Sequence, residues 1–261
     1  MRPRPQARRH GGSRAAGTVR VTAGGLWAVL PVKAWSEAKR RLSPVLGAGE
    51  REELARSMLD DVLAAVAGVP DISGTLAVTA DDVAARYLEG TGCEVLSEPR
   101  RGLNRALGTA AEELGRRGEA TMMVLPIDLP LATAADLEEL RARHLEDRRS
   151  QEGEQALRAA VTVAPDRFRS GTNALVCSPP GCIPFRFGDG SFHAHLREAE
   201  RAGAAHSSVE LANLGLDVDH PDDLAELLRL DRSSRTGHLL RRLGLRGLGV
   251  PDRLESPRNR D

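Results

Sequence analysis

Residues 121–131, TMMVLPIDLPL, join a short apolar run to a carboxylate set between two prolines. The run at 121–125 predicts a buried central strand, because it is short, apolar and followed at once by turn residues. Thr133 lies just beyond, with Asp136 three positions later, a spacing typical of a helix N-cap. A helix is therefore expected from this point to Leu145, which makes the segment a strand–turn–helix unit.

The same alternation extends outward in both directions. Short apolar runs predict further strands, at residues 26–32, 75–79, 94–96, 159–164, 174–177 and, at an edge, 209–211. Amphipathic segments predict helices, at residues 50–66, 82–88, 103–114, 192–202 with Ser191 as its cap, and 221–230. Strands that alternate with helices predict an α/β fold, a mostly parallel sheet in a three-layer arrangement.

Composition excludes several classes of protein. Lys+Arg and Asp+Glu are balanced at 37 each in 261 residues, and aromatic residues are 3% of the chain, so neither a nucleic-acid surface nor a base-stacking surface is expected. No apolar run approaches the roughly 20 residues that cross a bilayer. We therefore expect a cytoplasmic protein without a membrane partner. Three cysteines without a C-x-x-C spacing argue against disulfides and zinc.

Both ends of the chain differ in composition from its middle. Residues 1–25 are rich in Arg, Gly and Pro, and residues 231–261 carry many Arg and Gly with only scattered Leu. These patterns predict flexible tails on either side of one domain at 26–230.

Cations gather after the first predicted strand. Residues 31–42, PVKAWSEAKRRL, hold Lys33, Lys39, Arg40 and Arg41. Ligands of such sheets bind beyond the carboxyl ends of the strands, and Lys and Arg suit the oxygens of a polyphosphate. A solvated basic loop is the alternative, and the absence of G-x-x-x-x-G-K-[ST] excludes a P-loop.

Two acidic segments also follow predicted strands. Asp128, held by flanking prolines, is a candidate ligand for Mg²⁺, and the alternative is a turn residue whose carboxylate bonds its own backbone. In LDVDHPDD at 216–223, alternation places Asp217 and Asp219 on one side if the segment is extended, so they could share a metal. Asp222 and Asp223 are expected to favour the start of the last helix instead.

Two polar loops precede later elements of the chain. RSGTNAL at 169–175 enters a strand, and RFGDGSF at 186–192 opens a helix whose first backbone N–H groups could cradle an anion. A capped helix without a ligand is the alternative. His193 and His195 are two apart on that helix, do not share a face, and are both expected at the surface.

Together these segments resemble the 2-phospho-L-lactate guanylyltransferase family, including its phosphoenolpyruvate-using bacterial members, which make an intermediate of the deazaflavin coenzyme F-420. Six motifs in one order carry the resemblance: PVK…AKRRL at 31–42, GLN at 102–104, DLP at 128–130, GTNAL at 171–175, FGDGSF at 187–192 and DVDHPDDL at 217–224. The resemblance implies a nucleotidyltransferase fold of the nucleotide-diphospho-sugar transferase type, with Mg²⁺ as cofactor.

It also implies a role for each matching residue. Lys33, Lys39 and Arg41 would hold the GTP phosphates and, with Asp128, form the catalytic set. The guanosine would be bordered by Thr79, Gly102, Leu103 and Asn104. Mg²⁺ would be held by Asp128 with Asp217, or with Asp219 as the other candidate. The phosphorylated acid would be bound by Thr172, Gly188 and Ser191.

The reaction implied is attack of the acceptor's phosphate on the α-phosphorus of GTP, with release of pyrophosphate to leave a product for a downstream transferase. Its obstacle is repulsion between polyanions, where each pair of unit charges about 4 Å apart costs roughly 4 kcal/mol at an effective dielectric constant of about 20. Three alternative functions remain: another nucleotidyltransferase, a glycosyltransferase on the same sheet, or a non-catalytic GTP-binding regulator. The acceptor is also open, although the Arg- and Ala-rich, actinobacterial-looking composition favours phosphoenolpyruvate.

Overall fold

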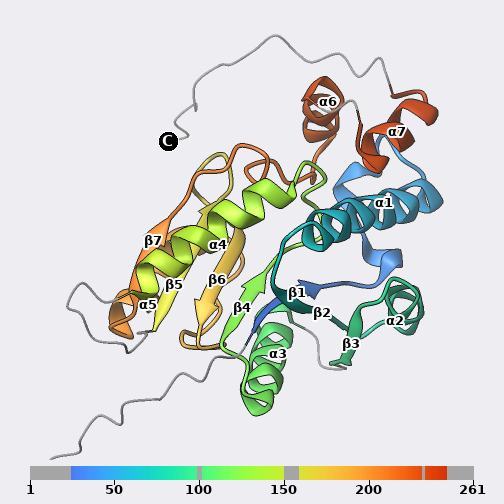
Figure 1. Cartoon of the computed structure of the whole chain (residues 1–261). Helices are drawn as coiled ribbons and strands as arrows, with labels where there is room; N and C mark the ends of the chain where they lie inside the picture. The colour runs from blue at the N-terminus through green and yellow to red at the C-terminus, as the bar shows by residue number, and fades with distance from the viewer. Residues whose placement is uncertain (1–24, 99–101, 150–158, 231–232, 246–261) are drawn as a thin grey trace, which may run out of the picture.

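Seven strands form one sheet in the order β3-β2-β1-β4-β6-β5-β7 (Figure 1). A computed structural model of the chain describes residues 25–98, 102–149, 159–230 and 233–245. The strands are β1 Leu26–Pro31, β2 Ile72–Thr79, β3 Glu94–Ser97, β4 Thr121–Val124, β5 Ala160–Pro165, β6 Thr172–Ser178 and β7 Ala205–Ser208. Neighbouring strands are parallel except where β6 pairs with β4 and β5, which confirms the predicted mostly parallel sheet.

Helices cover both faces of this sheet. They are α1 Ala48–Ala67, α2 Asp82–Glu89, α3 Leu103–Arg117, α4 Ala134–Arg148, α5 Ser191–Arg201, α6 Pro221–Leu230 and α7 Arg235–Arg242. Two short 3-10 helices, η1 Trp35–Glu37 and η2 Arg40–Leu42, follow β1. None of the helices in the described ranges is both long and apolar enough to cross a membrane.

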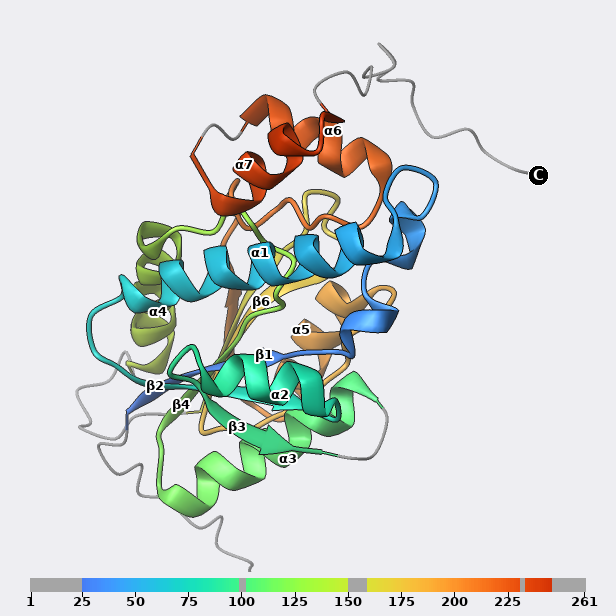
Figure 2. The ribbon, with the colours of Figure 1, turned by 90° about the vertical axis from the view of Figure 1, so that its right-hand side faces the viewer.

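Alternation along the strands produces the three layers. In β1, Ala28 and Leu30 join the core under α1, α2 and α4, whereas Trp27 and Val29 join the core under α3 and α5. Successive side chains of a strand point to opposite faces, so one buried strand feeds both cores. Figure 2 shows α1 on one side of the sheet and α3 on the other.

A third core extends beyond the predicted domain boundary at residue 230. Leu239 and Leu240 of α7 are buried against α1, α6 and η2, and Figure 2 shows α6 and α7 on the outer side of α1. The prediction of a flexible tail from residue 231 is therefore wrong for α7. Its stability comes from this tertiary contact, which its short Arg-rich sequence does not reveal. The N-terminal residues 1–24 and the residues from 246 onward lie outside the described ranges.

Two further sequence predictions need correction. The edge strand is Ala205–Ser208 instead of 209–211, because backbone pairing with β5 rather than apolar side chains defines it. Ser191 is the first residue of α5, not its cap. The cap is Gly190, whose φ of 69° is a left-handed conformation that glycine adopts without a steric penalty.

One buried carboxylate ties α7 to α1. Asp61 of α1 accepts hydrogen bonds from the backbone N–H groups of Arg235 and Thr236, both at 2.9 Å, and from the Thr236 hydroxyl at 2.6 Å. The first N–H groups of a helix have no partner within that helix, so Asp61 supplies what α7 lacks.

Replacing Asp61 with Ala should therefore lower the free energy of unfolding by about 2 to 3 kcal/mol, because the buried N–H and hydroxyl of Thr236 and the partly buried N–H of Arg235 lose their acceptor. Urea denaturation measures this change. The matched control is Glu52→Ala, on a partly exposed position of the same helix whose ion pair with Arg56 spans 3.8 Å, where a change below about 0.5 kcal/mol is expected. Equal effects of the two substitutions would contradict the capping role.

Candidate active site

The predicted site residues meet at one edge of the sheet. The carboxyl ends of β1, β2 and β4 point to this edge, and β6, which runs the other way, brings its first residue Thr172 there. The backbone N–H of Val218 donates to the carbonyl of Asp128 at 3.1 Å, which joins the loop after β4 to the loop before α6. Segments far apart in the chain are thus held side by side.

A lysine lies between two of the predicted carboxylates. The Lys39 ammonium donates to Asp128 Oδ2 at 2.8 Å and to Asp219 Oδ1 at 2.9 Å, with only 9% of its side chain exposed. Arg41 adds a longer contact to Asp219 Oδ2, at 3.4 Å. The structure therefore brings the basic loop and both acidic segments together, as the sequence predicted.

The local backbone explains how Lys39 reaches this position. Lys39 has φ 48° and ψ 42°, a left-handed conformation uncommon for a residue with a side chain, and η2 begins directly after it. Leu42, at the end of η2, is fully buried in the core with α1 and α6. Burial alone would lower the pKa of Lys39, but the charges and hydrogen bonds of Asp128 and Asp219 outweigh burial, so the pKa is raised and the ammonium stays charged.

Asp217 and Asp219 differ in their surroundings. The pKa of Asp219 is lowered, because Lys39 and Arg41 outweigh the effect of burial. The pKa of Asp217 is raised by burial and by the charge of Asp128, against a weakly opposing hydrogen bond from Asn173 Nδ2 to Asp217 Oδ1 at 3.3 Å. Of these three carboxylates, Asp217 is therefore the one that has no cationic partner among the described residues.

The basic loop contributes unequally to this cluster. Arg41 is exposed, and its contacts within the described ranges are to Asp219 and His220. Lys33, two residues past β1, is also exposed and takes no part in the ion pairs among the described residues. Within the same ranges, no three His, Cys, Asp or Glu side chains form a ready-made metal cage. Two carboxylates are enough for Mg²⁺ when substrate phosphates complete its shell.

Thr172 forms a hydrogen bond with His195, a residue that the sequence predicted at the surface. Its Oγ1 lies 3.0 Å from Nδ1 of His195, and His195 is fully buried. The prediction that His195 is a surface residue is wrong, while His193 is exposed as predicted. The error has a physical reason: α5 packs its His195 face on the sheet, and a loop N–H satisfies the imidazole there.

The start of α5 offers few free backbone donors. The N–H of Ser191 donates to the carbonyl of Gly188 at 3.1 Å, and that of Phe192 donates to the carbonyl of Ser170 at 3.2 Å. Gly188 has φ 130°, a backbone conformation that favours glycine. Two amides of the predicted cradle are thus committed to the protein, which gives the side-chain hydroxyls of this region a larger share in binding an anion.

Asn104 joins the two predicted substrate regions. Its Nδ2 donates to the carbonyl of Phe187 at 3.0 Å, and its Oδ1 accepts from the N–H of Phe187 at 2.8 Å. The amide that was predicted to contact the nucleotide therefore fastens the glycine-rich loop to the start of α3. Gly102 and Leu103 lie at the same helix start.

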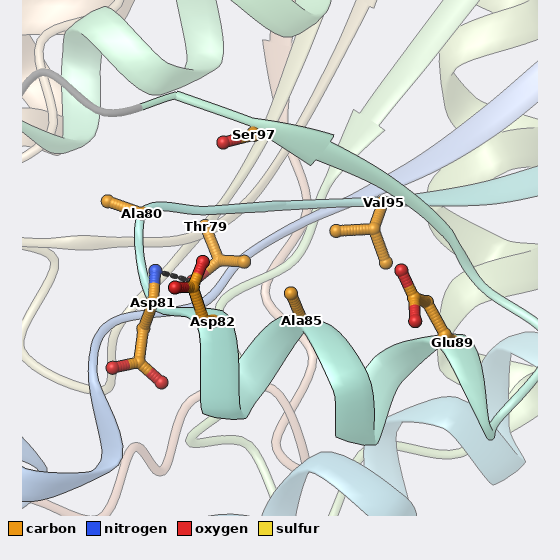
Figure 3. A pocket seen from close by; sticks show the side chains of 8 residues that line it. All are labelled: Thr79, Ala80, Asp81, Asp82, Ala85, Glu89, Val95 and Ser97. Atoms are coloured by element: carbon orange, nitrogen blue, oxygen red, sulfur yellow. Dashed lines mark hydrogen bonds between the residues drawn. The ribbon is translucent and has the colours of Figure 1, made fainter.

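Thr79 lies beside a pocket at the end of β2. Figure 3 shows this pocket of about 170 Å³, which is lined by Thr79, Ala80, Asp81, Asp82, Ala85, Glu89, Val95 and Ser97. The Thr79 hydroxyl accepts from the N–H of Asp81 at 3.1 Å. Three carboxylates make the pocket unsuitable for a triphosphate but compatible with the N–H donors of a nucleobase.

Comparison with known proteins fits this geometry. A family model described as "Guanylyl transferase CofC like" matches residues 26–251. The chain belongs to this family. A phosphoenolpyruvate guanylyltransferase of Rubrobacter xylanophilus is 38% identical over 202 residues, which cover 77% of this chain and 93% of the relative. A 2-phospho-L-lactate guanylyltransferase of Methanothermobacter thermautotrophicus is 33% identical over 217 residues, which cover 83% and 90%.

Solved structures show the same fold for this member of the CofC-like family. A protein provisionally assigned as a nucleotide-diphospho-sugar transferase, from Desulfovibrio desulfuricans G20, aligns with a TM-score of 0.67 at 16% identity, over 85% of this chain and 96% of that one. A nucleotidyl transferase from Methanothermobacter aligns with a TM-score of 0.54 at 15% identity, over 84% and 99%. The predicted nucleotidyltransferase fold is confirmed.

The two hydrogen bonds between Asn104 and the Phe187 backbone can be tested without an activity assay. Asn104→Ala should speed hydrogen exchange of the Phe187 amide by about fivefold, because one hydrogen bond contributes about 1 kcal/mol against local opening. Mass spectrometry or NMR measures this rate. Asn213→Ala, which removes an amide bonded to Asp136 on α4, should leave it unchanged. The same exchange rate in both variants would contradict the role of Asn104 in holding the glycine-rich loop.

Proposed function

We propose that this chain transfers the guanylyl group of GTP to a phosphorylated carboxylic acid and releases pyrophosphate. The observation that carries the proposal is the position of Lys39 between Asp128 and Asp219, at the sheet edge that also holds Thr172. The cations and carboxylates of this cluster support a triphosphate site, and Thr172 at the same sheet edge supports an acceptor site near it. The names of the relatives support the guanylyl donor, and the resemblance supports a role in making coenzyme F-420.

The side chains of the basic loop would bind and orient the triphosphate. Arg41, exposed and only loosely held by Asp219, is free to turn its guanidinium toward phosphate oxygens. Lys33 is exposed on the same loop and would add a movable charge. Lys39 would remain buried and keep Asp128 and Asp219 in place.

No protein nucleophile or general base is needed for the transfer. A phosphate monoester has a second pKa of about 6, so the acceptor is already a dianion for the most part at neutral pH. The remaining task of the chain is to hold two anions in line and to offset their repulsion. The acceptor would be held by Thr172, Ser191 and the backbone at Gly188. Asn104 would act indirectly, because its two hydrogen bonds to Phe187 fix the glycine-rich loop that carries Gly188 and Ser191.

The acidic residues fit a bound Mg²⁺. Asp128 and Asp217 repel each other and the pKa of Asp217 is raised, so a divalent ion between hard oxygen ligands would relieve both effects. When bound there, Mg²⁺ would neutralise charge on the transferring phosphates. We propose Asp128 and Asp217 as its main ligands, with Asp219 engaged by Lys39 and Arg41.

The acceptor is proposed to be phosphoenolpyruvate, with 2-phospho-L-lactate as the second candidate. Two bacterial relatives named phosphoenolpyruvate guanylyltransferase, from Rubrobacter xylanophilus and Conexibacter woesei, are 38% and 36% identical, compared with 33% for the archaeal 2-phospho-L-lactate guanylyltransferase. The activated product would be passed to a downstream transferase.

The proposal is tested by incubating the chain with GTP, Mg²⁺ and each acid, and by measuring pyrophosphate release and product mass. Asp128→Ala should reduce turnover about a thousandfold, since a metal ligand supports several kcal/mol of charge stabilisation. Asp222→Ala, at an exposed carboxylate in the first turn of α6, is the matched control and should stay within about twofold. Binding of GTP without any product from either acid would indicate a regulator instead.

A second experiment separates the two later carboxylates. Asp217→Asn should raise the Mg²⁺ concentration for half-maximal activity about tenfold or more, because Asp217 has no cationic partner among the described residues. Asp219→Asn should mainly raise KM for GTP, because Lys39 and Arg41 lose the carboxylate that orients them at the proposed triphosphate site. The reverse pattern would make Asp219 the metal ligand.

A further inference from the structure

His195 is a buried imidazole with a partner for each ring nitrogen. The backbone N–H of Arg186 donates to Nε2 at 2.9 Å, and Nδ1 lies 3.0 Å from Oγ1 of Thr172. The ring of Phe187 packs against the imidazole edge-on, with centroids 4.8 Å apart. His195 therefore links the glycine-rich loop to the first residue of β6.

The donors and acceptors fix one form of the ring. A backbone N–H can only donate, so Nε2 must carry a lone pair, and in a neutral imidazole the proton then resides on Nδ1. Burial and the Arg186 guanidinium lower the pKa of His195 to about 4, against an opposing effect of Glu198, so the ring is neutral at physiological pH. The Nδ1–H consequently donates to Thr172 Oγ1.

This tautomer decides what Thr172 can offer to a ligand. The Thr172 hydroxyl oxygen accepts the hydrogen bond from Nδ1–H, so its own hydrogen cannot also be donated to that nitrogen. The Thr172 O–H group is therefore available to donate to another acceptor. No other described residue forms a hydrogen bond with this hydroxyl. A free hydroxyl donor matters here, because the N–H groups of Ser191 and Phe192 at the start of α5 already have protein acceptors.

We propose that His195 is a positioning residue that holds the Thr172 hydroxyl as a hydrogen-bond donor toward the anionic group of the acceptor acid. The inference rests on the acceptor site proposed above. It adds a residue that touches neither substrate and acts through Thr172 alone. With the opposite tautomer, Thr172 would have to donate to Nδ1 and would present only lone pairs to an anion.

Two amide substitutions separate the two halves of this arrangement. In Asn, the side-chain amide overlies Nδ1, so His195→Asn keeps a donor to Thr172 but leaves the Arg186 N–H without an acceptor. In Gln, it overlies Nε2, so His195→Gln keeps the acceptor for Arg186 but loses the donor to Thr172. Each variant is thus the matched control of the other.

We expect His195→Gln to raise KM for the acid about five- to tenfold, with KM for GTP changed by less than about twofold. His195→Asn should be less stable to urea but should keep KM for the acid within about twofold of the original. Thr172→Val should raise KM for the acid as His195→Gln does, Thr172→Ser should restore it, and the double variant with His195→Gln should be no worse than Thr172→Val alone. A merely structural histidine would instead make KM follow the loss of stability in both variants, and that result would overturn the proposal.

The tautomer can be measured in the unsubstituted chain, independently of how the variants fold. Nitrogen-15 chemical shifts of the His195 ring near neutral pH should show a protonated Nδ1 and an unprotonated Nε2. A protonated Nε2 would refute the inference even if the enzyme is active. Absence of product with either acid would instead contradict the proposed function, whatever the tautomer, so the two failures are distinguishable.

Discussion

The site depends on one buried cation among three carboxylates. If Lys39 were absent, the carboxylates of Asp128, Asp217 and Asp219 would face one another at the sheet edge with only the exposed Arg41 beside Asp219, and burial would make their repulsion costly. The ammonium balances two of the three, which keeps both acidic loops at the edge in the absence of substrate. The third carboxylate is left short of positive charge, and this imbalance is what suits the site to a divalent ion.

Two kinds of contact keep the charged groups in register. Backbone contacts join the loops themselves, as where Val218 donates to the carbonyl of Asp128. Side-chain amides then join loops to neighbouring elements: Asn104 holds the glycine-rich loop, and Asn173 reaches both the carbonyl of Leu214 and Asp217. Uncharged backbone and side-chain amides thus position the charged groups. The site needs no additional charged residues for this purpose.

The sequence revealed the parts of this site that follow from strand ends. Lys39, Asp128 and the acidic pair before α6 all come after apolar runs, and parallel strands bring such positions to one edge. Alternation could not tell Asp217 from Asp219, because the difference arises from which of them Lys39 reaches. The buried state of His195 and the helix at 235–242 were missed for a related reason, since each depends on a partner in another element of the fold. That partner is Thr172 at the start of β6 for His195 and Asp61 on α1 for the helix. The edge strand β7 was misplaced because its AHSS sequence has no apolar alternation.

The reversed direction of β6 has a consequence for how acceptor preference could diversify. The parallel strands reach the edge through crossovers that contain helices, so their loops are constrained by the packing of whole layers. Thr172 reaches the same edge through a hairpin from β5, and a hairpin can change length with little entropic penalty and without moving a helix. Insertions and substitutions between residues 165 and 172 can therefore reshape the surroundings of the incoming acid while the GTP-facing half stays intact, which provides a route by which relatives with different acceptors could diverge from one scaffold.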